Sequence, residues 1–313
     1  MFEEFLDLLR KYNTVIIHRH SNPDGDAVGS QIGLKHIIKA SFPEKKVFAV
    51  GDEAGRYAFM EDSATDIIDD SEYTGALAVI LDTSASSLIS DTRYTLAEKT
   101  VRIDHHIYCE KIADVEITDT SYESCCGLIA EFAKESGLVL TPIAAKSLFT
   151  GMVTDSGRFR YDSVNSNTFA LASYLKTVDF DTGDIYRNLY SDDFDFILLR
   201  AKYVLKIRFT ENNVAYIYTP LDEAKSYKVS DFTLSRGMVN VMAEIKGVDI
   251  WVNFTETEAG VLAELRSSRY NINPIAVKYG GGGHAKASGA TLKNKEEAFE
   301  MLSDLDKIAR GEV

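Results

Sequence analysis

The sequence is poor in cysteine and has no long apolar run. Its 313 residues include three cysteines, Cys109, Cys125 and Cys126. An odd number with two adjacent residues does not make a disulfide framework, so we expect reduced thiols that behave as buried small hydrophobic groups. The N-terminal sequence MFEEFLDLLRKY lacks the basic start and apolar core of a signal peptide. No stretch approaches the roughly 18 apolar residues of a membrane span. These absences predict a cytoplasmic protein that does not associate with membranes.

The chain also lacks an excess of positive charge. It has 34 Lys and Arg against 48 Asp and Glu, which gives a net charge of -14 at pH 7. A protein that tracks along long nucleic acid needs a broad basic face, so this composition disfavours that class. A small anionic substrate in a local pocket is still compatible with it. The hydrophobic fraction of 45% predicts globular domains with a buried core.

Strand-like and helix-like segments alternate in the first half of the chain. The expected strands are residues 14–20, 46–50, 77–82 and 100–104, and the expected helices are residues 26–40, 126–136 and 143–153. This alternation predicts an α/β domain with a parallel sheet. Three of the strands run directly into polar residues, in the sequences HRHSNPDGD, LDTS and DHH. Because ligands bind beyond the carboxyl ends of such strands, we expect these residues to converge on one site.

The pattern changes near residue 180, where an acidic stretch precedes a helical segment. Further helices and strands follow it. The expected strands are residues 214–218, 249–255, 261–267 and 288–292, and the expected helices are residues 194–206, 237–246 and 296–310. We therefore expect a catalytic α/β domain at residues 1–185, a helical linker at 186–208 and a smaller α/β domain at 209–313.

Five of the six histidines lie in polar clusters beside aspartates or glycines. They are His18, His20, His105, His106 and His284. Buried charges cost several kcal/mol unless they are paired or bound to a metal, so packing alone explains this clustering poorly. The sixth, His36, is expected to be an ordinary helix residue.

The first cluster is His20-Ser-Asn-Pro23-Asp24-Gly25-Asp26. Pro23 and Gly25 favour a sharp turn, so the imidazole and both carboxylates can point into one space. One histidine and two aspartates suit a divalent cation such as manganese or magnesium. Alternatively, one of the two aspartates caps the following helix.

Further acids and histidines follow other predicted elements. Asp82 ends the apolar run LAVILD, where it binds a ligand or caps the next helix. Asp104, His105 and His106 follow the strand TVRI. Adjacent residues of an extended chain point to opposite sides, so two roles are implied for the two histidines unless their adjacency is accidental. Asp155 lies at the end of an expected helix, where it binds a ligand, caps the helix or forms a surface ion pair.

A glycine run at residues 280–283 is followed by His284 and Lys286. Consecutive glycines let backbone amides approach an anion closely, although such runs are also flexible linkers. The surrounding window, residues 265–295, has six basic and no acidic side chains, which predicts a local phosphate-binding surface. The basic residues are Arg266, Arg269, Lys278, Lys286, Lys293 and Lys295.

The order of these motifs resembles the DHH phosphoesterase superfamily. The glycine-rich ending resembles its members with a DHH-associated C-terminal domain, and among these the nanoRNase and 3′-phosphoadenosine 5′-phosphate (pAp) phosphatase type. The resemblance covers nearly the whole chain, and the fourth motif, often DTG, reads Asp155-Ser-Gly here. It implies a DHH domain at the N-terminus, a DHH-associated substrate-binding domain at the C-terminus, and an active site in the cleft between them.

The resemblance also implies two divalent metal ions, with Mn²⁺ expected and Mg²⁺ or Co²⁺ as alternatives. The implied metal ligands are His20, Asp24, Asp26, Asp82, His105 and Asp155, and the implied catalytic residues are Asp82, Asp104 and His106. Asp82 is expected to bridge the ions, His106 to face the phosphate and Asp104 to orient a histidine. His18 matches no ligand position. The implied substrate contacts are Arg158, Arg266, Ser268, Arg269, Gly281, Gly282, Gly283 and His284.

The expected activity is manganese-dependent hydrolysis of short RNA oligonucleotides to mononucleotides, by a monomer or homodimer, with pAp as a possible second substrate. A phosphodiesterase for cyclic or linear dinucleotides is a close alternative, because one metal site serves all phosphodiesters. A non-catalytic nucleotide sensor is disfavoured because every ligand position is filled. An inorganic pyrophosphatase is disfavoured by the GGGGH run, and a processive exonuclease by the acidic composition.

Overall fold

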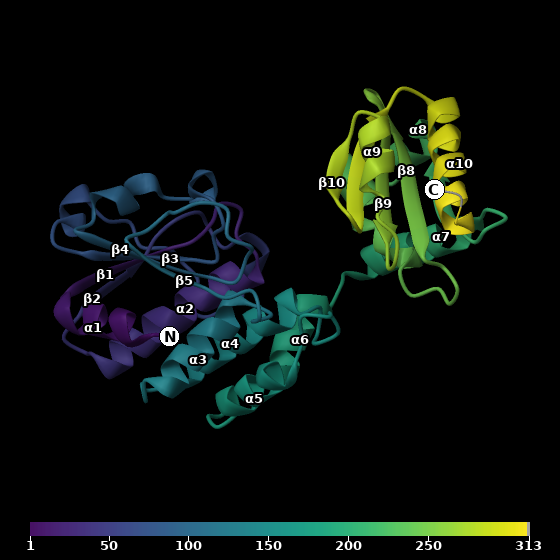
Figure 1. The fold of residues 1–313 in the computed structure, drawn as a ribbon. Coiled ribbons are helices and arrows are strands. Elements are labelled where there is room, and N and C mark those ends of the chain that lie inside the picture. The colour runs from purple at the N-terminus through teal and green to yellow at the C-terminus, as the bar shows by residue number, and fades with distance from the viewer. Residues whose placement is uncertain (312–313) are drawn as a thin grey trace. The chain divides into compact units, whose positions relative to one another are not determined.

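The computed structural model describes residues 1–311 and divides into two compact units. Unit 1 is Met1–Ser191 and unit 2 begins at Asp192. Residues 186–208, expected as a helical linker, contain the end of α6 (Thr182–Tyr190) and all of α7 (Phe194–Lys206). Each unit combines one sheet with several helices, so the α/β class is confirmed (Figure 1).

Unit 1 is built on a five-stranded sheet in the order β2-β1-β3-β4-β5. Every pair of neighbouring strands is parallel, as the sequence predicts. The strands are β1 (Thr14–His18), β2 (Lys46–Ala49), β3 (Leu77–Leu81), β4 (Lys99–Asp104) and β5 (Val115–Thr118). The first four match expected strands, and β5 is an addition that the alternation did not predict.

Helices of unit 1 cover one face of this sheet, and short 3₁₀ turns pack on the other (Figure 1). The remaining helices are α1 (Glu3–Lys11), α2 (Gly25–Ser41), α3 (Cys125–Glu135), α4 (Pro142–Asp155) and α5 (Ser166–Leu175). Helix α2 packs closely on α4 because Gly29 has no side chain: a Cβ there would lie 2.5 Å from the Ser147 carbonyl oxygen. Across residues 1–311, every helix is too short or too polar to cross a membrane.

Unit 2 has a six-stranded mixed sheet in the order β10-β11-β9-β8-β7-β6. Among the described strands of this second sheet, only β7 and β8 pair in parallel. The strands are β6 (Arg208–Phe209), β7 (Ala215–Thr219), β8 (Ile250–Thr257), β9 (Gly260–Ser267), β10 (Gly282–His284) and β11 (Ala287–Leu292). In addition to α7, the helices of unit 2 include α8 (Leu221–Ser226), α9 (Asn273–Lys278) and α10 (Lys295–Arg310).

The helix expected at residues 237–246 is wrong. A π-helical turn, Thr233–Gly237, is followed instead by a 3₁₀ turn, Val239–Met242. The buried amide of Asn253, on β8, donates hydrogen bonds of 2.7 Å to the carbonyl oxygens of Leu234 and Ser235. These bonds hold the π-helical turn against β8, so a tertiary contact fixes the chain just before the expected helix, and local periodicity does not decide the conformation.

Candidate metal centre

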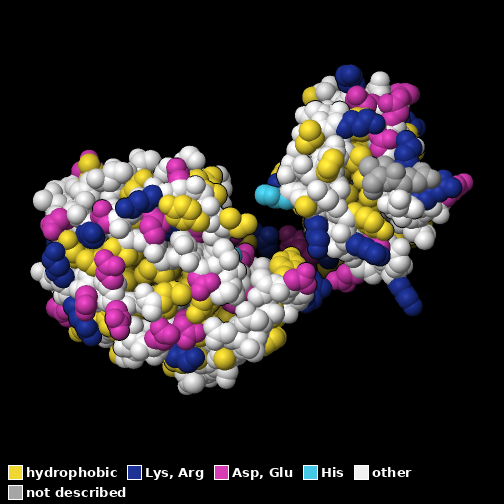
Figure 2. Space-filling model, viewed as in Figure 1, with side chains coloured by type: hydrophobic (Ala, Val, Ile, Leu, Met, Phe, Trp, Pro, Cys, Tyr) yellow, Lys and Arg dark blue, Asp and Glu magenta, His cyan; other side chains and the backbone are white. Residues whose placement is uncertain are grey.

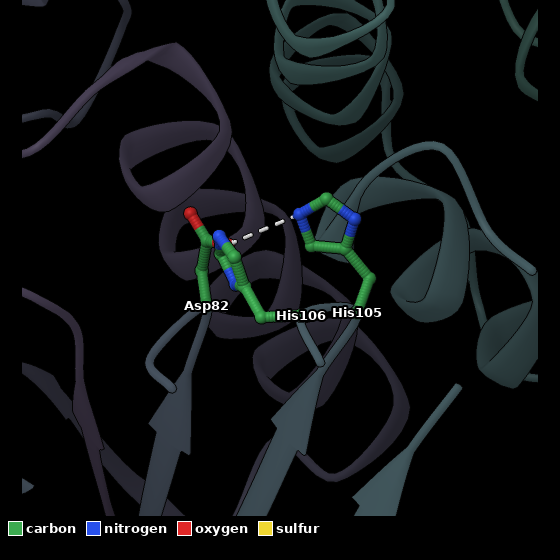
Figure 3. Close-up of side chains that lie close together, drawn as sticks. All are labelled: Asp82, His105 and His106. Atoms are coloured by element: carbon green, nitrogen blue, oxygen red, sulfur yellow. Dashed lines mark ion pairs between the residues drawn. The ribbon is translucent and has the colours of Figure 1, made fainter. Parts of the chain in front are cut away.

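The candidate site lies at the carboxyl ends of three neighbouring strands of unit 1. His20 follows β1, Asp82 directly follows β3, and Asp104 ends β4 with His105 and His106 after it. Because β1, β3 and β4 are adjacent in the sheet, their polar extensions meet at one edge. Figure 3 shows Asp82, His105 and His106 pointing toward one another just beyond the strand ends.

Asp82 occupies the middle of this cluster, and each of its carboxylate oxygens faces a different histidine. Its Oδ2 lies 3.5 Å from His20 Nε2, and its Oδ1 lies 3.5 Å from His105 Nε2. The side chain is buried, and Oδ1 has no hydrogen-bond partner within the described part of the chain. Asp82 also has a left-handed backbone, with φ of 52°. A buried, unsatisfied carboxylate oxygen is costly, so the position fits a charged ligand such as a metal ion.

The structure brings all six expected ligands together. Potential ligand atoms lie within 4.8 Å of one another in three overlapping groups of residues. The groups are His20, Asp24 and Asp82; Asp26, His105 and Asp155; and Asp82, His105 and His106. Asp82 belongs to the first group and His105 to the second. The distance of 3.5 Å between Asp82 Oδ1 and His105 Nε2 brings the two groups into contact. An arrangement of this kind could hold two divalent ions that share one carboxylate.

Backbone carbonyl groups fix the orientation of two of the histidines. His20 Nδ1 lies 2.9 Å from the Ser21 carbonyl oxygen, and His105 Nδ1 lies 3.3 Å from that of Tyr122. A carbonyl oxygen only accepts, so Nδ1 carries the proton and donates it in both rings. Nε2 therefore faces the neighbouring carboxylates, where it donates a proton in the metal-free cluster and would present its lone pair to a metal ion in place of that proton.

Asp26 is held by the N-terminus of α3. Its Oδ2 accepts a hydrogen bond from the Cys125 backbone N–H (2.7 Å), and its Oδ1 accepts one from Cys126 (2.9 Å). Both cysteines are buried, as expected, whereas Cys109 is exposed, so that expectation is wrong for Cys109. The role of the two N–H groups could not be predicted, because every residue except proline has a backbone N–H. Asp24 does cap α2, through bonds from the N–H groups of Asp26 and Ala27, so the capping alternative is confirmed for Asp24.

Crowding of carboxylates shifts the titration of the whole cluster. Burial raises the pKa of Asp155 to about 7 and that of Asp26 well above its usual range, and the negative charge of Asp82 adds to both effects. Burial lowers the pKa of His20, but the carboxylates of Asp24 and Asp82 outweigh it and raise that pKa to about 10. The metal-free cluster therefore retains protons that balance its negative charge. Its oxygen and imidazole donors suit divalent cations in the same role.

Asp104 orients His106 rather than joining the ligand groups. It is fully buried, and its Oδ1 accepts a hydrogen bond of 2.7 Å from His106 Nδ1. This bond raises the pKa of His106. The side chain is half-exposed, and its other ring nitrogen, Nε2, takes no part in the bond. His106 borders a pocket of about 230 Å³ that Ser84 and Leu88 also line. Those two residues carry no recognisable sequence signal.

Two further histidines lie outside the cluster. The buried ring of His18 contacts the Asp91 carbonyl oxygen (3.1 Å) and the Tyr73 hydroxyl (3.4 Å). Burial lowers its pKa to about 4, so it is a neutral core residue. His36 forms an ion pair with Asp62 at 3.0 Å, as an ordinary helix residue can.

The expected substrate contacts of unit 2 lie on or next to β9 and β10, the two neighbours of β11 in the sheet. Arg266 on β9 is opposite Ala287 on β11, which is in turn opposite His284 on β10. Gly283 has a left-handed φ of 135°, and a Cβ there would lie 2.6 Å from the Ala287 carbonyl oxygen. Part of the glycine run therefore forms a strand of the sheet, and the linker alternative is wrong. Gly281 packs equally closely on β11, whereas Gly282 has open space around it.

The basic window of unit 2 is partly neutralised by acids from outside it. Its three ion pairs are Arg266 with Glu264 (3.1 Å), Lys278 with Asp304, at 2.5 Å, and Lys293 with Glu297 (3.7 Å). Exposed Ser268 donates a hydrogen bond to Asp249, and the Arg269 guanidinium lies over the Tyr270 ring. The local positive potential is therefore weaker than the sequence composition alone suggests.

Comparison with known proteins is consistent with this geometry. Residues 14–152 match the model of the DHH family, N-terminal domain, and residues 213–311 match that of the DHHA1 domain. The chain is 32% identical to the bifunctional oligoribonuclease and PAP phosphatase NrnA of Bacillus subtilis, over 99% of both chains. It is 34% identical to the probable enzyme of that name from Streptococcus mutans, over 98% of this chain and 99% of the other.

A solved structure supports the same relationship. An exopolyphosphatase-related protein from Bacteroides fragilis aligns with a TM-score of 0.84 and 25% identity, over 98% of this chain and 95% of the other. The two domain matches, the full-length relatives and the ligand cluster at the strand ends agree. The chain therefore belongs to the DHH family, as a member with a C-terminal DHHA1 domain.

Proposed function

We propose that the protein hydrolyses short RNA oligonucleotides to mononucleotides and also removes the 3′-phosphate of pAp. The observation that carries this proposal is the buried Asp82 carboxylate, whose two oxygens face His20 and His105 from opposite ligand groups. A shared carboxylate is what a two-metal phosphoesterase requires. The choice of substrates rests on the names of the full-length relatives, bifunctional oligoribonuclease and PAP phosphatase.

We assign the six clustered residues to the metals. His20 and Asp24 would hold one ion, Asp26, His105 and Asp155 would hold the other, and Asp82 would serve both. We further propose manganese as the metal, because imidazole and carboxylate donors together suit it. When bound, two divalent ions lower the pKa of a water molecule and stabilise the charge that develops on the phosphate.

The remaining groups of the site act on the substrate. His106, fixed through Nδ1 by Asp104, directs Nε2 away from that bond and donates a hydrogen bond to a phosphate oxygen. Asp104 is a positioning residue, because it accepts the Nδ1 proton and favours the doubly protonated ring, which can also donate through Nε2. On unit 2 we assign the substrate contacts to the residues at the ends of β9 and β10 and the turn after β9. They are Arg266, Ser268, Arg269, Gly281, Gly282, Gly283 and His284.

Surface charge supports the preference for short substrates. In Figure 2 acidic side chains are scattered over the visible face of unit 1 among basic and hydrophobic ones. With a net charge of -14, such a surface repels a long phosphate backbone. The pocket beside His106, about 230 Å³ in volume, offers room for a phosphate group and its immediate surroundings.

The proposal is tested by incubating the protein and Mn²⁺ with a ribodinucleotide, a long RNA, pAp and cyclic di-AMP. We expect fast release of mononucleotides from the dinucleotide, phosphate release from pAp and little cleavage of the long RNA. Asp82→Ala should abolish both reactions. Asp7→Ala, which removes an exposed acid of α1 that pairs with Arg10, should retain them. Preference for cyclic di-AMP moves the assignment to cyclic dinucleotides, and full activity of Asp82→Ala overturns the two-metal proposal.

A further inference from the structure

Two arginine–tyrosine contacts lie together in unit 1, and neither belongs to the metal centre. The Arg158 guanidinium carbon is 3.6 Å from the centroid of the Tyr190 ring. That of Arg56 is 5.4 Å from the centroid of the Tyr57 ring. Both arginines are exposed, while both tyrosines are partly buried. The contacts thus present guanidinium groups to solvent on top of aromatic rings that are anchored in the protein.

These contacts lie beside the candidate pocket. The backbone of Gly25, the first residue of α2, and the charge of Asp24 both act on the Tyr57 hydroxyl, whose pKa is raised chiefly by burial. Arg56 Nη2 donates a hydrogen bond of 3.3 Å to the carbonyl oxygen of Leu189, next to Tyr190.

The other end of the same surface reaches the pocket through Asp155. Arg158 lies in the turn directly after Asp155, which ends α4. Asp24 and Asp155 line the pocket, whereas the four side chains do not line it and follow these two residues outward through Gly25 and through the turn after α4. We call Arg56, Tyr57, Arg158 and Tyr190 the stacking ledge.

A strained but firmly bonded turn aims Arg158 at Tyr190. Gly157, Arg158 and Phe159 all have left-handed backbone, with φ of 56°, 64° and 60°. The Arg158 N–H donates to the Val153 carbonyl oxygen (2.8 Å), and the Phe159 N–H donates to Ser156 Oγ (2.9 Å). Left-handed residues other than glycine persist only where surrounding contacts fix them, and they gather at binding and catalytic sites.

We propose that the stacking ledge binds the nucleobase next to the scissile phosphate, with the base stacked on the solvent face of the Arg158 guanidinium. The proposal rests on the proposed function and deepens it. A guanidinium is planar and weakly hydrated, and proteins that bind single-stranded RNA stack bases on arginine planes and aromatic rings. Tyr190 lies against the Arg158 guanidinium, so it acts as a positioning residue, and the exposure of Arg158 makes the guanidinium accessible to a base. A phosphate, by contrast, binds the N–H edge of a guanidinium.

The inference is tested by comparing a ribodinucleotide with the same molecule lacking one base. The measured quantity is the ratio of kcat/KM for the two substrates, with Mn²⁺ present. Loss of a stacked base costs roughly tenfold, so Arg158→Lys, which keeps the charge but loses the plane, should lower this ratio about tenfold. Tyr190→Leu should lower the ratio similarly. Tyr190→Phe keeps the ring, so it should keep the wild-type ratio. Arg10→Lys is the matched control, because Arg10 is an exposed arginine of unit 1 that pairs with Asp7.

The outcomes separate base stacking from phosphate binding. If Arg158→Lys and Tyr190→Leu reduce cleavage of both substrates equally, Arg158 contacts phosphate and the inference is refuted. If the wild-type protein cleaves neither substrate, the proposed function fails instead. The inference is then decided by calorimetric binding of AMP and of ribose 5-phosphate. A preference for AMP that Arg158→Lys removes supports the stacking ledge, and equal binding of the two ligands overturns it.

Discussion

Replacing Asp155 by asparagine should stabilise the metal-free protein while it abolishes metal binding and activity. Burial, with the charge of Asp82 adding to it, raises the pKa of Asp155 to about 7. The pKa of an aspartate in an unfolded chain is about 3.9, and each pKa unit corresponds to about 1.4 kcal/mol. The ionised side chain therefore costs about 4 kcal/mol of stability by this arithmetic. Since the side chain is 30% exposed, solvent screening reduces the expected gain to roughly 2 kcal/mol.

The dependence on pH gives the prediction its sign. An acid whose pKa is higher in the folded state destabilises that state as pH rises, with no cost below the unfolded pKa and the full cost above the folded one. The gain from Asp155→Asn should thus be absent near pH 4 and complete above pH 7. Denaturant unfolding in EDTA at several pH values measures it, with Asp7→Asn as the control. A variant less stable than wild type at pH 8 would refute the argument from carboxylate crowding.

Three further predictions concern metal binding and two ion pairs. Saturating Mn²⁺ should raise the unfolding free energy of wild type, by about 2.7 kcal/mol at 100 times Kd, and this shift in thermal melting should vanish in Asp82→Ala. Arg102→Met should destabilise unit 1 by roughly 3 kcal/mol, because the buried guanidinium pairs with Glu116 at 2.5 Å. Adding Glu116→Gln should recover part of that loss in urea unfolding; no recovery would argue that Arg102 acts through packing instead. Asp304→Asn should lower the stability of unit 2 at pH 7 by about 1 kcal/mol. Lys278 and Lys307 overcome the effect of burial and lower the pKa of Asp304 to about 2, so its contribution is present above about pH 4 and lost as pH falls toward 2. An equal effect of this substitution at pH 2 and pH 7 would contradict the ion-pair explanation.

The grouping of site residues could be predicted from sequence because the fold imposes it. His20, Asp82 and Asp104 each follow an apolar strand, and parallel strands joined by helices place their carboxyl ends at one edge. Once the alternation predicted a parallel sheet, convergence of these residues followed. The same argument does not reach Asp155, whose place depends on the packing of α4 against α2. For that residue the sequence left a ligand, a cap and a surface ion pair open, and only the family resemblance favoured the ligand.

Features that depend on tertiary hydrogen bonds were outside the reach of the sequence. A helix was expected at residues 237–246, yet the chain there forms a 3₁₀ turn after a π-helical turn whose Leu234 and Ser235 carbonyls bind the Asn253 amide. The stack of Arg158 on Tyr190 joins two residues far apart in the chain, and the resemblance that implied Arg158 as a substrate contact did not pair it with Tyr190. A pattern read along the chain identifies which residues are polar or apolar. It does not identify which distant group will satisfy a given carbonyl or ring face.

The way Asp26 is held explains how a destabilising cluster keeps its geometry without metal. Its two oxygens accept hydrogen bonds from Cys125 and Cys126, at the positive end of α3. The carbonyl groups of Ser21 and Tyr122 fix the rings of His20 and His105 in the same way. None of these contacts uses a ligand lone pair of the imidazoles, so cations can displace protons from the cluster without rearranging its frame. Metal binding then depends mainly on deprotonation, and the energy lost to charge crowding in the metal-free protein is recovered when the cations bind.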